Sequence, residues 1–278
     1  MTEPECFKRI FPDTATSTHK MAHTGEAELI SQTITYVRKY MAHYDSSHDI
    51  SHIRRVLGLA LHLHTSIPSL NRLLVTLAAL LHDIGDKKYL PPGTTSGATL
   101  VEDFLLSIDC DPKLAADVQT VVNHVSYSNE IKHPEEVKEV LARLPELGVV
   151  QDADRLDAIG AVGIGRTFTY GASVRAGKVA KRAAKESAEA ELVGGKGGCG
   201  RQTGIVDGMN TQREEALGSS MDDSMVHFVE KLERLEGMMK TEMGRKMARE
   251  RTERLKQFRG WWEEEVGLAV DDDFSGLL

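Results

Sequence analysis

The sequence predicts an all-α protein. Apolar residues recur at helical spacing in most segments that follow Glu26. Proline and glycine fall between these segments, in the stretches SIPSL, YLPPGTTSG, KHPEE and RLPELG, where helices are expected to stop. No segment has the alternating pattern of a strand. With 278 residues, of which 41% are hydrophobic and 27% charged, the chain can bury a sizeable helical core.

The expected helices follow from this periodicity. The segment 50–64 has it most clearly, because Ile53, Val56, Leu57 and Ala60 form one repeating face. The expected helices are Leu29–Met41, Ile50–His64, Leu70–Ile84, Thr99–Ile108, Leu114–His124, Glu135–Leu144, Val149–Tyr170, Met221–Lys240 and Thr241–Val266. Side chains expected in the core near the C-terminus are Met239, Met243, Met247, Trp261 and Trp262.

The organisation along the chain is read from composition. Residues 1–25 are rich in Thr, Ser and His and are expected to be a disordered polar tail. Residues 26–268 are expected to form one helical domain. Within it, residues 171–220 are rich in glycine and have little to bury, so they are interpreted as a mobile insertion. Residues 269–278 form a C-terminal tail.

The overall charge and the cysteines exclude several protein classes. A net charge of -8 disfavours binding to duplex nucleic acid, which usually requires an excess of Lys and Arg. No apolar run is long enough to span a membrane, and the N-terminus has no apolar signal region. The three cysteines lack disulfide or zinc-type spacing. A cytoplasmic location is therefore predicted, with a nuclear location left open.

The stretch LLHDIGDKKYL places His82 and Asp83 at the exit of the most apolar expected helix, with Gly85 as a suitable C-terminal cap. A carboxylate there faces the negative end of the helix dipole, which costs about 0.3–1 kcal/mol before any burial penalty. A buried charge needs compensation, and a divalent cation would provide it.

Two other stretches offer further ligands for such a cation. SHDISHIRRV contributes His48, Asp49 and His52, while VVQDADRLDAIG contributes Asp152, Asp154 and Asp157. Imidazole together with carboxylate suits Mn, Fe, Ni, Zn or Mg. The residues alone select neither the metal nor one aspartate among the last three.

Four stretches together resemble the HD-domain metal-dependent phosphohydrolase superfamily: HDISHIRRV, LAALLHDIGDKKY, QDADRLDAIGAVGIGRTFTYG and HFVEKLERLEGMMKTEMGRKMARERTE. More narrowly, they look like the branch of small HD hydrolases that includes bacterial nucleotide pyrophosphohydrolases. The resemblance covers roughly Glu26 to Gly267 and implies an HD-type helical bundle.

The resemblance also implies roles for individual residues. It makes His52, His82, Asp83 and Asp154 the metal ligands, and Asp86 the catalytic residue that orients or deprotonates the water. Basic residues of the family match Arg55, Lys88 and Arg166, which are expected to bind the phosphate of the substrate. His48 and His124 are expected to donate to that phosphate or to support a second metal. Apart from the resemblance, Asp152 and Asp157 are expected to pair with Arg155 or to cap neighbouring backbone, and Asp157 is expected to support the site rather than bind the metal.

The activity implied is hydrolysis of a phosphate ester or anhydride in a nucleotide or related small molecule, with a metal-activated water as nucleophile. Mn is the favoured metal, and Ni, Mg, Fe, Zn and Co are alternatives. One competing hypothesis is an HD-fold oxygenase with two irons, the second held by His48 and His124. Another is a nucleotide-binding protein without catalysis. An exposed helix pair could also form a homodimer.

Overall fold

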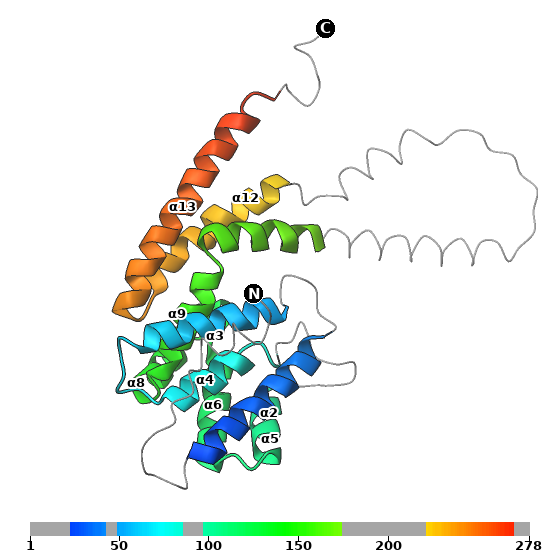
Figure 1. Ribbon diagram of the computed structural model, residues 1–278. Coiled ribbons are helices and arrows are strands. Elements are labelled where there is room, and N and C mark those ends of the chain that lie inside the picture. The colour runs from blue at the N-terminus through cyan, green and yellow to red at the C-terminus, as the bar shows by residue number, and fades with distance from the viewer. Residues whose placement is uncertain (1–22, 43–48, 86–96, 174–220, 270–278) are drawn as a thin grey trace, which may run out of the picture. The chain divides into compact units, whose positions relative to one another are not determined.

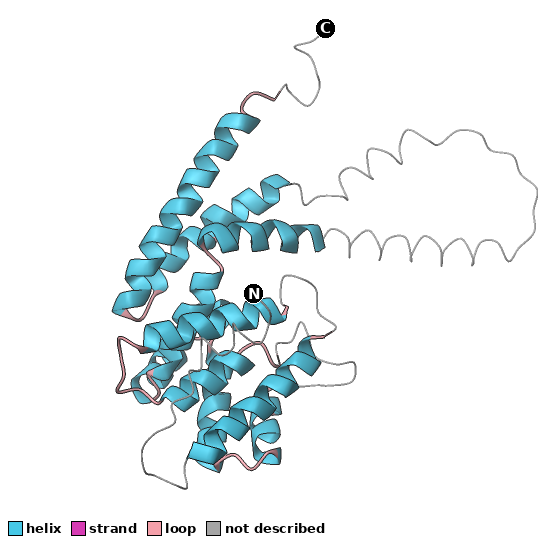
Figure 2. Ribbon diagram, in the orientation of Figure 1, coloured by secondary structure: helices cyan, strands magenta, loops and turns pink. Residues whose placement is uncertain are grey.

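The computed structural model describes residues 23–42, 49–85, 97–173 and 221–269 (Figure 1). Every regular element in these ranges is helical, without a strand, which confirms the all-α prediction (Figure 2). None of the described helices is long and apolar enough to cross a membrane. Most of the expected tails and of the expected insertion lies outside the described residues.

The helices are named as in Figure 1. They are α2 (His23–Met41), α3 (Ile50–His64), α4 (Arg72–Leu81), α5 (Leu100–Ser107), α6 (Pro112–His124), α7 (Tyr127–Lys132), α8 (Pro134–Arg143), α9 (Glu146–Asp157), α12 (Met221–Glu230), the 3-10 helix η1 (Leu232–Met238) and α13 (Glu242–Val266). A further helix covers residues 160–173.

The described residues divide into two compact units. Unit 1 contains those up to Asp157 together with Gly237–Arg249. Unit 2 contains the described residues of Ala158–Glu236 and Glu250–Leu278. The single domain expected over residues 26–268 stays a prediction.

Helix α4 is the centre of unit 1. It packs against α2, α3, α6 and α9, and every residue from Leu74 to Leu81 is buried. The side chain of Asn71 accepts a hydrogen bond from the backbone N–H of Leu74 and so caps the start of this helix. The apolar sequence therefore makes α4 a core helix. The residues that directly follow Leu81 begin in the interior of unit 1.

Helix α3 brings a histidine to the same region. The side chain of Asp49 accepts a hydrogen bond from the backbone N–H of His52 at 3.1 Å, which caps α3 at its first turn. Ile53, Val56 and Leu57 are buried, as their spacing predicts. Since α3 packs against both α4 and α9, its buried face meets the ends of both helices.

Two expected helices are wrong in extent. The expected helix Val149–Tyr170 is interrupted, because α9 ends at Asp157 and the next helix begins at residue 160. Gly160 has a φ of 74°, a left-handed conformation that an α-helix does not continue through. The expected helix Met221–Lys240 also divides, into α12 and η1. Helix α7 was not expected at all.

Aromatic rings pack together in unit 2. The Phe168 ring lies 5.6 Å from that of Trp262 and 5.9 Å from that of Phe258, measured between ring centroids. Phe228 is fully buried and its ring is 6.0 Å from that of Phe258. Trp261 is 61% exposed, so its expected place in the core is wrong. Adjacent residues of a helix point in different directions, and only one tryptophan of the pair reaches the ring cluster.

Candidate metal centre

Four side chains from three parts of unit 1 converge beside the end of α4. The Nε2 atoms of His52 and His82 are 3.1 Å apart. Each also lies 3.5 Å from an oxygen of Asp83. An oxygen of Asp154 is 3.6 Å from His52 Nε2 and 3.8 Å from His82 Nε2. The structure therefore gathers the four residues expected as metal ligands, here called the ligand cluster.

Both histidine rings are oriented by a hydrogen bond at the nitrogen that points away from the cluster. His52 Nδ1 lies 2.8 Å from Asp157 Oδ2, and His82 Nδ1 lies 2.9 Å from the backbone oxygen of Ala79. Carboxylate and carbonyl oxygens only accept, so each Nδ1 carries the hydrogen. In a neutral ring this leaves a lone pair on Nε2, and the two Nε2 atoms face each other.

Asp157 has a second partner that holds it in place. The Arg55 guanidinium donates from Nε to Asp157 Oδ1 at 2.7 Å and from Nη2 to Oδ2 at 3.0 Å. The pKa of Arg55 is raised, chiefly by this hydrogen-bonded pair. Asp157 is buried, and its two oxygens connect Arg55 to the His52 ring. Arg55 therefore has a structural role, and its contact with a phosphate stays a prediction.

The donor set of the ligand cluster suits a divalent cation. Atoms about 2.1 Å from one cation are separated by about 3.0 to 3.5 Å in octahedral or tetrahedral arrangements, close to the distances observed. His52, His82 and Asp83 offer ligand atoms that all lie within 4.8 Å of one another. Two nitrogen lone pairs and two carboxylates lie close together in the ligand cluster. A positive charge between them would offset their mutual repulsion. The residues present thus fit a metal, and a His/Asp site of this kind does not reveal its identity.

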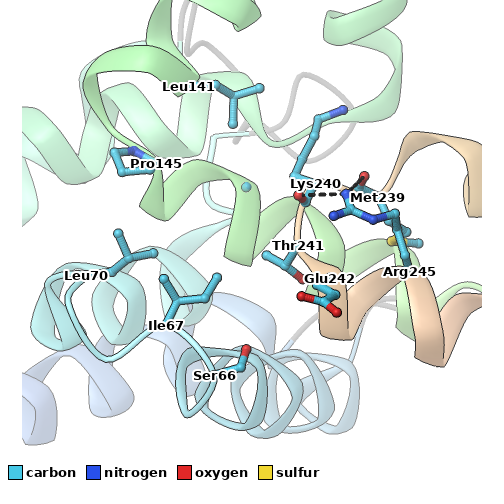
Figure 3. Close-up of a pocket in the computed structure, with 11 residues that line it drawn as sticks. Ser66, Ile67, Leu70, Leu141, Pro145, Met239, Lys240, Thr241, Glu242 and Arg245 are labelled. Carbon is cyan, nitrogen blue, oxygen red and sulfur yellow. Dashed lines mark hydrogen bonds between the residues drawn. The ribbon is translucent and has the colours of Figure 1, made fainter.

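The carboxylates are the more exposed part of the cluster. Both imidazole side chains are 1% exposed, whereas the side chain of Asp83 is 15% and that of Asp154 30% exposed. A small ligand would therefore approach over the carboxylates. A separate pocket of about 600 Å³ in unit 1 is not this site, because none of the four residues lines it (Figure 3).

The other residues expected at the site are distributed differently. Asp86, Lys88 and His48 lie outside the described residues. Arg166 lies in the helix over residues 160–173 of unit 2, and its role stays a prediction. His124 ends α6 and belongs to no group of metal-type ligands among the described residues.

The ring of His124 has partners of its own. Its Nδ1 donates to the backbone oxygen of Thr120 at 2.7 Å, and its Nε2 is 3.1 Å from Glu136 Oε1. These contacts explain the position of His124 without a second metal. No observation on this residue therefore favours the two-iron alternative.

Behind α9 lies a group of ion pairs that the sequence did not suggest. Glu130 accepts hydrogen bonds from Arg155 Nη2, from Lys240 Nζ at 2.7 Å and from Gln151 Nε2 at 3.1 Å. Burial acts to raise the pKa of Glu130, but the hydrogen bonds from Lys240 and Arg155 outweigh it and the pKa is lowered. Arg155 was expected as a possible partner of Asp152, and its hydrogen-bonded carboxylate is Glu130 instead.

Asp152 has partners other than those expected from the sequence. It is fully buried and accepts hydrogen bonds from the backbone N–H groups of Lys240 and Thr241. Burial raises the pKa of Asp152, and these hydrogen bonds oppose the shift. Asp152 was expected to cap neighbouring backbone, and the backbone groups that it binds belong instead to a segment far along the chain. The signal in the sequence for this contact is Thr241, which directly precedes the helical pattern of α13.

Replacing Asp157 by alanine should weaken binding of Mn²⁺ by about 10- to 100-fold, because the His52 ring loses the acceptor that orients it. Titration of the folded protein with Mn²⁺, followed by electron paramagnetic resonance of the free ion, measures the effect. Asp117→Ala is the control, since the ion pair of Asp117 in the described part of the chain is with the exposed Lys113. Equal Mn²⁺ affinity in both variants would show that the orientation of His52 does not matter for binding.

Two imidazoles and two carboxylates from three segments meet inside a helical bundle. This arrangement is typical of all-α proteins with a His/Asp site for a divalent cation. The family model described as HD domain matches residues 49–159 of the chain, a range that includes the whole ligand cluster. This segment of the chain thus resembles an HD domain.

Known proteins resemble the chain over most of its length. The uncharacterized protein YpgQ of Bacillus subtilis is 28% identical over 233 residues, which cover 84% of this chain and 91% of YpgQ. The crystal structure of YpgQ in complex with ADP is 27% identical, covers 87% of this chain and 96% of that one, and has a TM-score of 0.58. An HD-superfamily hydrolase from Bacillus thuringiensis is 28% identical, covers 88% and 100%, and has a TM-score of 0.54. The chain thus has the fold of HD-superfamily hydrolases.

Proposed function

We propose that the protein is a divalent-metal-dependent phosphohydrolase that acts on a nucleotide or a related phosphate ester or anhydride. The observation that carries the proposal is the ligand cluster, in which two fixed imidazole nitrogens and two carboxylates face one point. The similarity to YpgQ, whose structure was determined with ADP, supports a nucleotide as the substrate class.

The four residues of the ligand cluster would hold the cation in this proposal. Mn is the favoured metal. A divalent cation held there would supply polarisation of a phosphoryl oxygen and a lowered pKa of a water molecule. The partly exposed side chains of Asp83 and Asp154 leave access for a phosphate, and both imidazole side chains are buried.

Other residues have supporting roles in the same proposal. Asp157 and Arg55 hold the His52 ring, so that its Nε2 lone pair keeps one direction. Asp86 would accept a proton from the attacking water, and Lys88 would compensate charge on the phosphate. Both residues follow Asp83 closely in the chain, which supports their assignment to this site.

The proposal is tested by incubating the protein with nucleoside mono-, di- and triphosphates and Mn²⁺, and by identifying the products with ³¹P NMR. We expect release of phosphate or pyrophosphate that stops when EDTA removes the metal. A protein that binds Mn²⁺ yet leaves every nucleotide intact would contradict the hydrolase proposal and favour a nucleotide-binding protein without catalysis. Two irons per chain after anaerobic purification would instead favour the oxygenase.

A further inference from the structure

Asp152 is held by hydrogen bonds from a segment that begins α13. Its Oδ1 accepts the backbone N–H of Lys240 at 2.8 Å. Its Oδ2 accepts the backbone N–H of Thr241 at 2.7 Å and the Thr241 hydroxyl at 2.8 Å. The Thr241 oxygen in turn accepts the backbone N–H of Gly244 at 2.9 Å and caps α13. We call these hydrogen bonds the Asp152 anchor.

A second contact fixes the same side of α9. Arg155 Nη1 donates to the backbone oxygen of Met238 at 3.0 Å. Asp152 and Arg155 are one turn apart on the helix, so the segment 238–241 holds α9 at two successive turns. Figure 3 shows Thr241, Lys240 and Met239 side by side in this segment, which also borders the pocket.

The anchor lies opposite the ligand cluster across α9. An α-helix turns by about 100° per residue, so Asp152 and Arg155 face roughly the reverse of the direction that Asp154 and Asp157 face. The contacts agree, since Asp154 and Asp157 both reach His52 while Asp152 reaches Thr241. Rotation of α9 about its axis would carry the two carboxylates away from His52.

We propose that Asp152 is a positioning residue for the cation site: it sets the rotation of α9 and thereby the place of Asp154 and Asp157. The inference rests on the proposed function only as far as cation binding by the ligand cluster. Asp152 is a buried carboxylate outside the ligand cluster. Its effect on metal affinity is separate from its effect on the stability of the fold.

Gly244 provides a substitution that disturbs the anchor without removing either partner. A Cβ at this position would collide with Asp152 Oδ2 and lie 2.7 Å from Thr241 Oγ1. A Cβ at Gly260, on the same helix, would meet nothing within 4 Å. Both substitutions add one methyl group to α13 and raise helix propensity, so they differ mainly in their effect on the anchor.

The test compares Mn²⁺ dissociation constants of folded variants, measured by electron paramagnetic resonance at a temperature well below unfolding. Gly244→Ala and Asp152→Asn should weaken binding by about 10- to 100-fold, as loss of supporting contacts around metal ligands typically does. Gly260→Ala should bind like the unchanged protein. Leu105→Ala removes a buried side chain of α5 and should lower stability while leaving Mn²⁺ affinity intact.

Thr241 gives a milder pair of variants if Gly244→Ala or Asp152→Asn does not fold. Thr241→Ser keeps the hydroxyl and should leave the Mn²⁺ affinity unchanged, whereas Thr241→Val removes the hydroxyl and should weaken binding. Full affinity in a folded Gly244→Ala, Asp152→Asn or Thr241→Val protein overturns the inference and leaves the proposed function standing. If the unchanged protein binds no divalent cation, both are overturned. If it binds Mn²⁺ but hydrolyses nothing, the hydrolase proposal alone is lost.

Discussion

Replacing His82 by alanine should reduce metal-dependent nucleotide hydrolysis by about a thousandfold or more. The reason is that Nε2 of His82 faces the nitrogen of His52 and oxygens of Asp83 and Asp154 at the centre of the cluster. If the cation contributes about 4 kcal/mol to the transition state, its loss corresponds to three powers of ten in rate. Initial rates at saturating Mn²⁺ measure the effect, together with the number of Mn²⁺ ions bound per chain.

His62→Ala is the matched control for this substitution. His62 also lies on a helix, in the last turn of α3, but it is exposed and belongs to no ligand group among the described residues. It should keep both turnover and one Mn²⁺ per chain. Undiminished turnover in the His82→Ala protein would remove His82 from the chemistry and with it the proposed centre.

Replacing Glu130 by glutamine should destabilise the protein by about 3 kcal/mol near neutral pH, because Arg155 is buried and loses its charged partner. The pKa of Glu130 is lowered in the folded state. Its contribution is therefore complete above the usual glutamate pKa of about 4.3 and is lost as the pH falls through the lowered folded value. Urea unfolding at a series of pH values measures this dependence.

The unchanged protein and the Glu130→Gln protein should therefore have similar free energies of unfolding at acid pH, where Glu130 is protonated in the folded and the unfolded state. Glu135→Gln serves as the control, since Glu135 pairs with Lys138 across an exposed surface and should leave the unfolding midpoint unchanged. A Glu130→Gln protein whose stability differs from the original by the same amount at every pH would contradict the assigned role of the carboxylate.

Local patterns predicted the parts of the site that depend on neighbours in the chain. The helix Ile50–His64 has its expected bounds, because Asp49 supplies a cap and the apolar face is regular. The His82-Asp83 pair was found from a polar ending on an apolar run. Helix α4 ends at Leu81 rather than at the expected Ile84, and the pair lies in the turn that leads to Gly85 at a φ of 85°.

Contacts between distant segments could not be predicted in this way. The choice of Asp154 over Asp152 and Asp157 depends on which side of α9 faces His52. In the proposed arrangement, that side is set by the contact of Asp152 with Lys240, which is 88 positions away in the chain. Helical periodicity contains no information about such a partner, and only the family resemblance selected Asp154. The ion pairs of Glu130 were missed for the same reason.

The distance in sequence between the parts of the centre has a consequence for biosynthesis. His52 and the carboxylate that orients it are 105 positions apart. At about 5 to 20 residues per second, a ribosome needs roughly 5 to 20 seconds to pass from one to the other. Once His82 has been made, the nascent chain carries both histidines, but it has neither Asp154 nor Asp157 until α9 is translated. The newly made polypeptide thus gains its complete set of ligands only after α9 has been translated.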